Sequence, residues 1–123
     1  MRIEDMFLSL TPNEKMFIQS FEAISGFEEF GQKFNIKLTN DVSIMIKPSS
    51  SNPLNDDCLI EVKFEEIDGE FNSTKTKTNF LYHSMIEMCE LLPLHLKSKK
   101  IIEAECADAL HIFLRKFERG WQI

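Results

Sequence analysis

The string Glu61-Val62-Lys63 carries the residues of this sequence that are most suggestive of chemistry. Polar and apolar residues alternate around it, so we expect a strand on which Glu61 and Lys63 point to the same side. Metal-assisted hydrolysis needs carboxylates that converge on one point, and the string supplies one of them. The alternation is equally typical of salt-bridging charges on a solvated sheet face, so both interpretations stay open.

An acidic residue, an apolar residue and a lysine in succession on a strand resemble the Glu-x-Lys half of the PD-(D/E)xK nuclease motif. In that family a pair of carboxylates holds a divalent metal ion, and the lysine helps to activate the attacking water. The resemblance covers residues 34–92 loosely and implies that Asp41, near the start of the preceding strand, is the second acid. The proline that the family has before this acid is Asn40 here. A metal-dependent nuclease that uses Asp41, Glu61 and Lys63 is the alternative function.

Negative charge is concentrated between Asp56 and Glu70, a stretch that we call the acidic segment. It holds seven acids and one base, so its net charge of −6 equals that of the whole chain. Such a local field attracts a basic partner and raises the association rate, although a charge run can also serve solubility alone. The acids that we expect to bind the partner are Asp56, Asp57, Glu61, Glu65, Glu66, Asp68 and Glu70.

Two apolar residues, Met45 and Leu59, are expected to lie beside these carboxylates. Strict alternation along the predicted strands points both side chains outward on one sheet face. Exposed apolar side chains surrounded by charges have the composition of a protein interface, with an apolar centre and a charged rim. We therefore include Met45 and Leu59 in the predicted partner-binding surface.

The composition predicts one globular domain spanning residues 1–123, since 43% of these 123 residues are hydrophobic and 28% are charged. No apolar run is long enough for a membrane span, and the N-terminus does not resemble a signal peptide, so we expect a cytoplasmic protein without a membrane partner. A net charge of −6 also argues against nucleic acid as a partner. No phosphate-binding loop or zinc-ligand spacing is present, so we expect no cofactor and no metal. Cys58, Cys89 and Cys106 fall in apolar runs and are expected to be reduced core residues.

Hydrophobic periodicity predicts an α+β fold of two layers, with an N-terminal helix, a three- to four-stranded antiparallel sheet and two C-terminal helices. Residues 3–10 have the spacing of a short amphipathic helix. In the next segment Thr11 and Glu14 form a capping box, with Pro12 in the first turn. The helix that begins there is expected to bury three apolar residues and to end at Gly26; these residues are Phe17, Phe21 and Ile24.

The next third of the chain has the alternation of strands. Residues 34–38 and 42–46 are expected to form a hairpin with a three-residue loop, because a two-residue loop would place opposite polarities on one face. A third strand over residues 58–65 points its even-numbered side chains inward. Asp68-Gly69 signals another hairpin turn, after which residues 71–78 form either a polar edge strand or a loose loop.

Helical spacing dominates the last third. Residues 79–92 place Leu81, Met85 and Met88 on one stripe, and Pro93 is expected to end this helix. Ser98 is expected to cap a final helix whose inner face is Ile102, Cys106, Ala109, Leu110, Phe113 and Phe117.

These features together predict a non-enzymatic, acidic protein-binding module. In its size and charge the chain resembles a bacterial immunity protein, which neutralises a basic toxin, commonly a nuclease, by occupying its active cleft with carboxylates. A phage-encoded inhibitor or a secretion chaperone would have the same features. The sequence does not indicate an oligomeric state.

Overall fold

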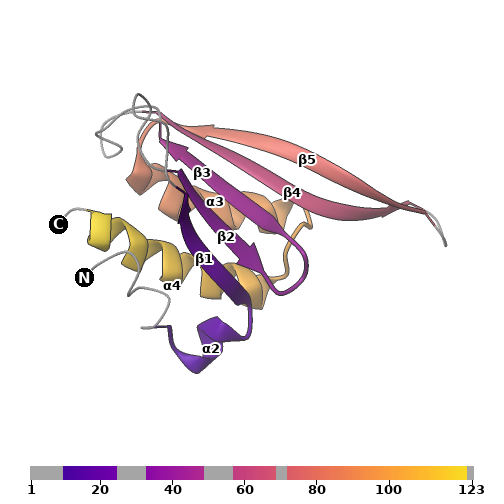
Figure 1. The fold of residues 1–123 in the computed structure, drawn as a ribbon, viewed down its shortest axis with the longest axis horizontal. Coiled ribbons are helices and arrows are strands. Elements are labelled where there is room, and N and C mark those ends of the chain that lie inside the picture. The colour runs from indigo at the N-terminus through magenta and orange to yellow at the C-terminus, as the bar shows by residue number, and fades with distance from the viewer. Residues whose placement is uncertain (1–9, 25–32, 49–56, 69–71, 122–123) are drawn as a thin grey trace.

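The computed structural model describes residues 10–24, 33–48, 57–68 and 72–121 (Figure 1). Within these residues the chain forms a one-turn helix, five strands and two longer helices. The elements are α2 (Pro12–Lys15), β1 (Ile18–Ile24), β2 (Lys33–Leu38), β3 (Ser43–Pro48), β4 (Cys58–Asp68), β5 (Asn72–Tyr82), α3 (Met85–Ser98) and α4 (Ala104–Trp121). The predicted α+β class is confirmed, but the sheet has more strands than predicted and the N-terminal helix is much shorter.

The sheet is an antiparallel meander in which each strand pairs with its neighbour in the chain, in the order β1-β2-β3-β4-β5. Helices α3 and α4 lie behind the sheet in the view of Figure 1. The core fills the space between these two layers. Its fully buried side chains include Phe34, Ile36, Ile44, Ile46 and Ile60 from the strands and Met85, Met88, Leu92, Leu96 and Phe113 from the helices.

The hairpin of β2 and β3 has the predicted register. Ile36 pairs with Ile44 and Phe34 pairs with Ile46, so the loop holds three residues. The Leu38 N–H donates to the Val42 carbonyl oxygen at 2.8 Å, which closes the loop. Asp41 has a φ of 64°, in the left-handed region that such loops need at their last position. Polarity alone was therefore enough to set this register.

The helix predicted after Thr11 is wrong beyond its first turn. Thr11 caps α2 as predicted, since its hydroxyl accepts from the Glu14 N–H at 3.2 Å, but residues 18–24 form strand β1. The register shifts by one between Ile18 and Ser20, so Gln19 is an extra residue in the strand. This bulge places Ile18 and Phe21 on the same face at a spacing of three, which imitates the spacing of a helix.

The helix predicted over residues 79–92 is wrong at both ends. Residues 79–82 complete β5, because the pairing with β4 continues without a break to Cys58↔Tyr82. The N-cap of α3 is Ser84, whose hydroxyl accepts from the Glu87 N–H at 3.1 Å. The helix then runs through Pro93, which is buried, because the buried residues Leu92 and Leu96 anchor the helix on both sides of the proline.

The last helix begins later than predicted. Ser98 ends α3 instead of capping α4, and the Ala107 N–H donates to the Glu103 carbonyl oxygen at 2.9 Å at the start of α4. The predicted inner face is correct at Cys106, Ala109, Leu110 and Phe113, which are buried, whereas Ile102 is buried but precedes the helix. The side chain of Phe117 lies outside the described part of the chain.

Other predictions also fall on residues that the structure does not describe. These are the helix over residues 3–10, of which only Leu10 is described, the stop at Gly26, and the turn at Asp68-Gly69, of which only Asp68 is described. The edge strand predicted over residues 71–78 is present as β5, which is longer than predicted. No helix among the described residues has the length and apolar character needed to cross a membrane.

A first prediction concerns Phe113, which is fully buried and meets the Phe21 ring edge to face at a centroid distance of 5.2 Å. Phe113→Ala should lower the free energy of unfolding by about 3–5 kcal/mol, because it opens a cavity between the sheet and α4. The neighbouring Ile112 is 46% exposed, so Ile112→Ala is the matched control and should cost no more than about 0.5 kcal/mol. Equal losses in urea denaturation would contradict this packing.

Glu14 links α2 to α4 through a buried carboxylate. Its side chain is 1% exposed, and its Oε1 accepts from Lys116 Nζ at 2.7 Å and from the Thr11 hydroxyl at 3.1 Å. A buried carboxylate is stable only while a cation and hydrogen bonds compensate its lost hydration. Lys116 therefore holds the start of the described chain against its last helix.

Lys116→Met should lower the free energy of unfolding by about 3 kcal/mol at neutral pH, because it leaves the Glu14 carboxylate buried without a cation. Arg115→Met is the control, since Arg115 and Glu90 are both exposed and lie 4.0 Å apart, and it should cost less than about 1 kcal/mol. Urea denaturation measures both losses. The double variant Glu14→Gln, Lys116→Met should recover part of the loss, and a failure to do so would contradict the assigned role of the carboxylate.

Candidate functional site

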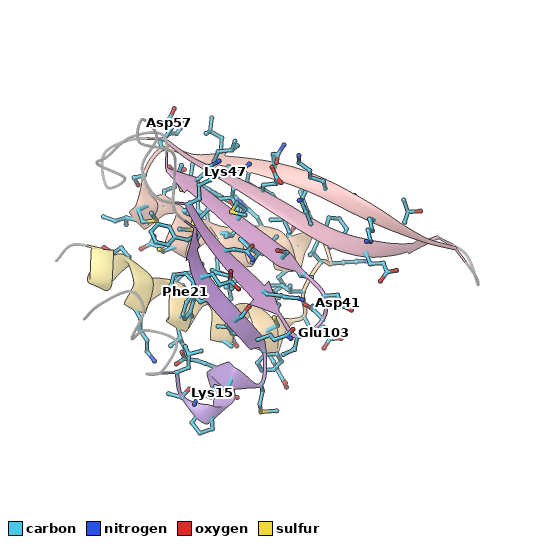
Figure 2. All side chains as sticks on the ribbon, in the orientation of Figure 1. Lys15, Phe21, Asp41, Lys47, Asp57 and Glu103 are labelled. Atoms are coloured by element: carbon cyan, nitrogen blue, oxygen red, sulfur yellow. The ribbon has the colours of Figure 1, made fainter. Side chains whose placement is uncertain are left out.

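The candidate site is the outer face of the sheet, the face turned away from α3 and α4. No described element covers it, and Lys47 and Asp41 can be located on this side of the molecule in Figure 2. The pairing of the strands assigns each side chain to a face, because alternate residues point to opposite sides. Glu61, Lys63 and Leu59, all singled out from the sequence, lie on this outer face.

Glu61 is surrounded by three lysines from three different strands. Its carboxylate lies 2.9 Å from Lys47 Nζ, 3.3 Å from Lys77 Nζ and 3.7 Å from Lys63 Nζ. Its side chain is only 13% exposed, whereas that of Lys63 is 66% exposed. The hydrogen bond from Lys47, followed by that from Lys77, lowers the pKa of the Glu61 carboxyl below its usual value, against the opposing effect of burial. Glu61 is therefore an anion already paired within the protein.

Positive charge exceeds negative charge among the described side chains that the register places on the outer face. Lys63 lies directly opposite Lys77, a like-charged pair that costs stability unless a carboxylate lies between them, as Glu61 does here. Six lysines face outward against three glutamates, namely Lys33, Lys37, Lys47, Lys63, Lys75 and Lys77 against Glu22, Glu61 and Glu65. The excess of acids in the linear sequence does not carry over to this face.

The described part of the acidic segment runs along β4, and its described acids Asp57, Glu61 and Glu65 do not gather at one point. Asp57 precedes the strand, where its Oδ1 lies 3.1 Å from His83 Nδ1 and raises the pKa of that imidazole. Glu65 lies opposite Lys75, near the other end of the strand. The side chains of Glu66 and Asp68 lie outside the described part of the structure, as do Asp56 and Glu70 altogether. Their role in binding stays a prediction.

An apolar patch lies on the outer face beside Glu61. Leu59 and Leu81 are directly opposite each other on β4 and β5, and they are 38% and 57% exposed. Met45 on β3 is half-buried next to them, opposite Glu61. Leu81 was missed by the sequence analysis, because residues 79–82 were assigned to a helix. The alternation of Asn79 to Tyr82, with Leu81 between two inward aromatic residues, was the signal that could have found it.

A groove of about 540 Å³ lies beside Ser43, where β3 begins, and the hairpin of β4 and β5 continues beyond this point. Pairing of β3 with β4 ends at Ser43↔Lys63, whereas β4 and β5 pair as far as Asp68↔Asn72. The lysines that line the groove are Lys37, Lys63, Lys75 and Lys77, and its carboxylates are Asp41 and Glu65. The groove is therefore open, and it has more cations than anions.

The residues of the nuclease resemblance are only partly brought together. Asp41 and Lys63 both line the groove, but Glu61 is not part of its lining and its carboxylate is paired with lysines. Among the described residues, no three His, Cys, Asp or Glu side chains lie close enough together to hold a metal ion. Within the described part of the chain, Asp41, Glu61 and Lys63 thus do not form the converging set of groups that metal-assisted hydrolysis requires.

The three cysteines are buried in the core, as predicted. Burial raises the pKa of the Cys58 thiol to about 12 and that of Cys106 to about 11, and it raises the pKa of Cys89 as well. A thiol that is protonated at neutral pH is a poor nucleophile. These residues act as core side chains, and Cys89 also donates from Sγ to the Leu114 carbonyl oxygen at 3.2 Å.

Comparisons with known proteins yield no relative. No family model matches this chain, and neither a search of curated proteins nor one of solved structures finds a match.

A third prediction concerns Lys47→Met, which removes the ammonium nearest to Glu61. The pKa of Glu61 should rise toward its usual value, which an NMR titration of its carboxyl group measures. A lowered folded-state pKa stabilises the protein above the unfolded-state pKa, and this contribution is lost as the pH falls through the folded-state value. The variant should lose up to about 1 kcal/mol at neutral pH and nothing in acid.

The control for this experiment is Lys15→Met, which removes an exposed lysine from α2, away from the sheet. It should leave the titration of Glu61 unchanged. If Lys47→Met also leaves that titration unchanged, Lys47 is not the principal partner of Glu61.

Proposed function

We propose that this chain is a non-enzymatic protein-binding module and that the outer face of its sheet is the binding surface. The observation that supports the proposal is the exposed pair Leu59 and Leu81 beside Met45, on a face that no described element covers. Lysines and glutamates surround this apolar centre. Such an arrangement, an apolar patch with a charged rim, is typical of protein interfaces.

The finer proposal is that the module is an immunity or inhibitor protein that neutralises a toxin. The size of the chain and its net charge of −6 support it. In this proposal the partner contacts Met45, Leu59 and the acids of the acidic segment. The basic character of the partner is supported by the net charge of the sequence. The described carboxylates add no support, because Glu61 is paired with lysines and Glu65 lies opposite Lys75.

No specific observation favours a metal-dependent nuclease as the function of this chain. The Glu61 carboxylate, which would have to bind the metal, accepts from Lys47 and Lys77 instead. Ammonium groups at these distances repel a divalent cation from this carboxylate. We therefore propose binding, and not hydrolysis, as the function of this face.

Site-specific photo-crosslinking tests the binding surface. A photoreactive amino acid at position 81 should capture one defined partner, whereas the same group at position 112, on an outward position of α4 with similar exposure, should not. Leu59→Lys should reduce the captured yield about tenfold or more, because it places a charge in the apolar centre. Ile112→Lys is the control and should leave the yield unchanged.

The captured protein then tests the finer proposal by co-expression. If it inhibits growth, this chain should restore growth and its Leu59→Lys variant should not. Equal capture from positions 81 and 112, or none from position 81, would overturn the binding surface. Capture of a harmless partner at position 81 would overturn the immunity function while leaving the surface in place.

A further inference from the structure

The groove is lined by exposed lysines, and the packing of the core does not require them. Lys63 and Lys77 face each other across β4 and β5, and they remain 66% and 54% exposed although both approach Glu61. Lys37 and Lys75 line the same groove and form no ion pair with any described residue. A single carboxylate, Glu61, compensates Lys63 and Lys77 and also pairs with Lys47, so positive charge exceeds negative charge at the groove and an anionic ligand would be attracted to it.

The backbone at the groove is also open. Phe64 and the residues that follow it in β4 pair with β5 on one side, but they have no partner in β3 on the other. The N–H and C=O groups of such an edge can accept an additional extended strand. The groove therefore offers both cations and backbone hydrogen-bonding groups to an extended polypeptide.

We propose that this groove binds an acidic, extended segment of the partner protein, whose carboxylates contact Lys37, Lys63, Lys75 and Lys77. The proposal rests on the outer face being the binding surface proposed above, and it names the chemistry of the partner at that face. The acidic segment predicts a basic partner, whereas the groove predicts that the part of the partner bound there is acidic. The reason is that lysines from β2 and β5 outnumber the acids in the lining of the groove.

Two observations favour a polypeptide over a nucleic acid. Asp41 and Glu65 lie in the lining and repel a continuous phosphate backbone, as does the net charge of −6, whereas a peptide can avoid them by the placement of its side chains. The apolar patch at Leu59 also lies four residues from Lys63 along β4, about 13 Å in a strand. An extended segment can reach both if it has apolar residues at one end and acidic residues at the other.

The test uses the full-length chain and synthetic peptides as probes. One peptide joins a run alternating Glu and Val to an apolar end, and its counterpart has Gln in place of Glu. Binding is followed through the amide NMR signals of the protein. Saturable shifts should appear at Ser43, Lys63 and Thr76 and be absent at Ile112, and the Gln peptide should bind at least about tenfold more weakly.

Charge-reversal variants supply the matched comparison. The double variant Lys37→Glu, Lys75→Glu should weaken binding of the Glu peptide about tenfold or more, because two cations of the groove become anions. The double variant Lys15→Glu, Lys97→Glu changes the net charge by the same amount at exposed positions outside the groove, and should weaken binding less than about twofold. Unchanged unfolding curves show that both double variants are folded.

Three results would overturn this inference. These are equal weakening by the two double variants, equal binding of the Glu and Gln peptides, and stronger binding of single-stranded DNA than of the Glu peptide at the same amides. The last result would assign the groove to nucleic acid. Crosslinking from position 81 is independent of these measurements, so a loss of the groove does not remove the apolar binding surface.

Discussion

The described helices α3 and α4 pack against one side of the sheet, and this constraint determines the role of nearly every described residue in the strands. Each strand has to send alternate side chains into a dry core and into water. Phe34, Ile44 and Ile60 satisfy the first condition with no exposure, while Lys37, Lys47 and Lys63 on the same strands satisfy the second. The core lies on the inner face, so the side chains of the outer face are not needed for packing and can serve binding.

The same alternation explains which parts of the fold could be predicted from the sequence. The register of β2 and β3 follows from polarity, since a slip of one residue would bury lysines. The strand β1 could not be recognised, because the bulge at Gln19 converts a spacing of two into a spacing of three. The boundary between β5 and α3 differs for another reason. The Ser84 hydroxyl accepts from the Glu87 N–H and the Glu87 carboxylate accepts from the His83 N–H, and this capping, whose sequence signature is Ser84 followed three residues later by Glu87, marks the true start of the helix.

The candidate site was less predictable than the fold, because its charges come from strands that are distant in the sequence. The acidic segment was evaluated as a linear run, in which Glu61 has one base nearby. The sheet adds Lys47 from β3 and Lys77 from β5 to the same carboxylate. Pairing between β3 and β4 crosses a proline-bounded loop and has no local turn signal, so neither lysine could be assigned to Glu61 beforehand. The electrostatics of a sheet surface are set by register, which a count along the chain does not contain.

The order of the elements has a consequence for the way this protein is made. Because each strand pairs with the one before it, the sheet can grow hairpin by hairpin while the chain leaves the ribosome. Helices α3 and α4 emerge only after all the described strands. Until then the side chains of Phe34, Ile44 and Ile60 have no helical layer to cover them. The nascent protein thus exposes a continuous apolar surface to aggregation until α3 and α4 have left the ribosome and packed onto the sheet.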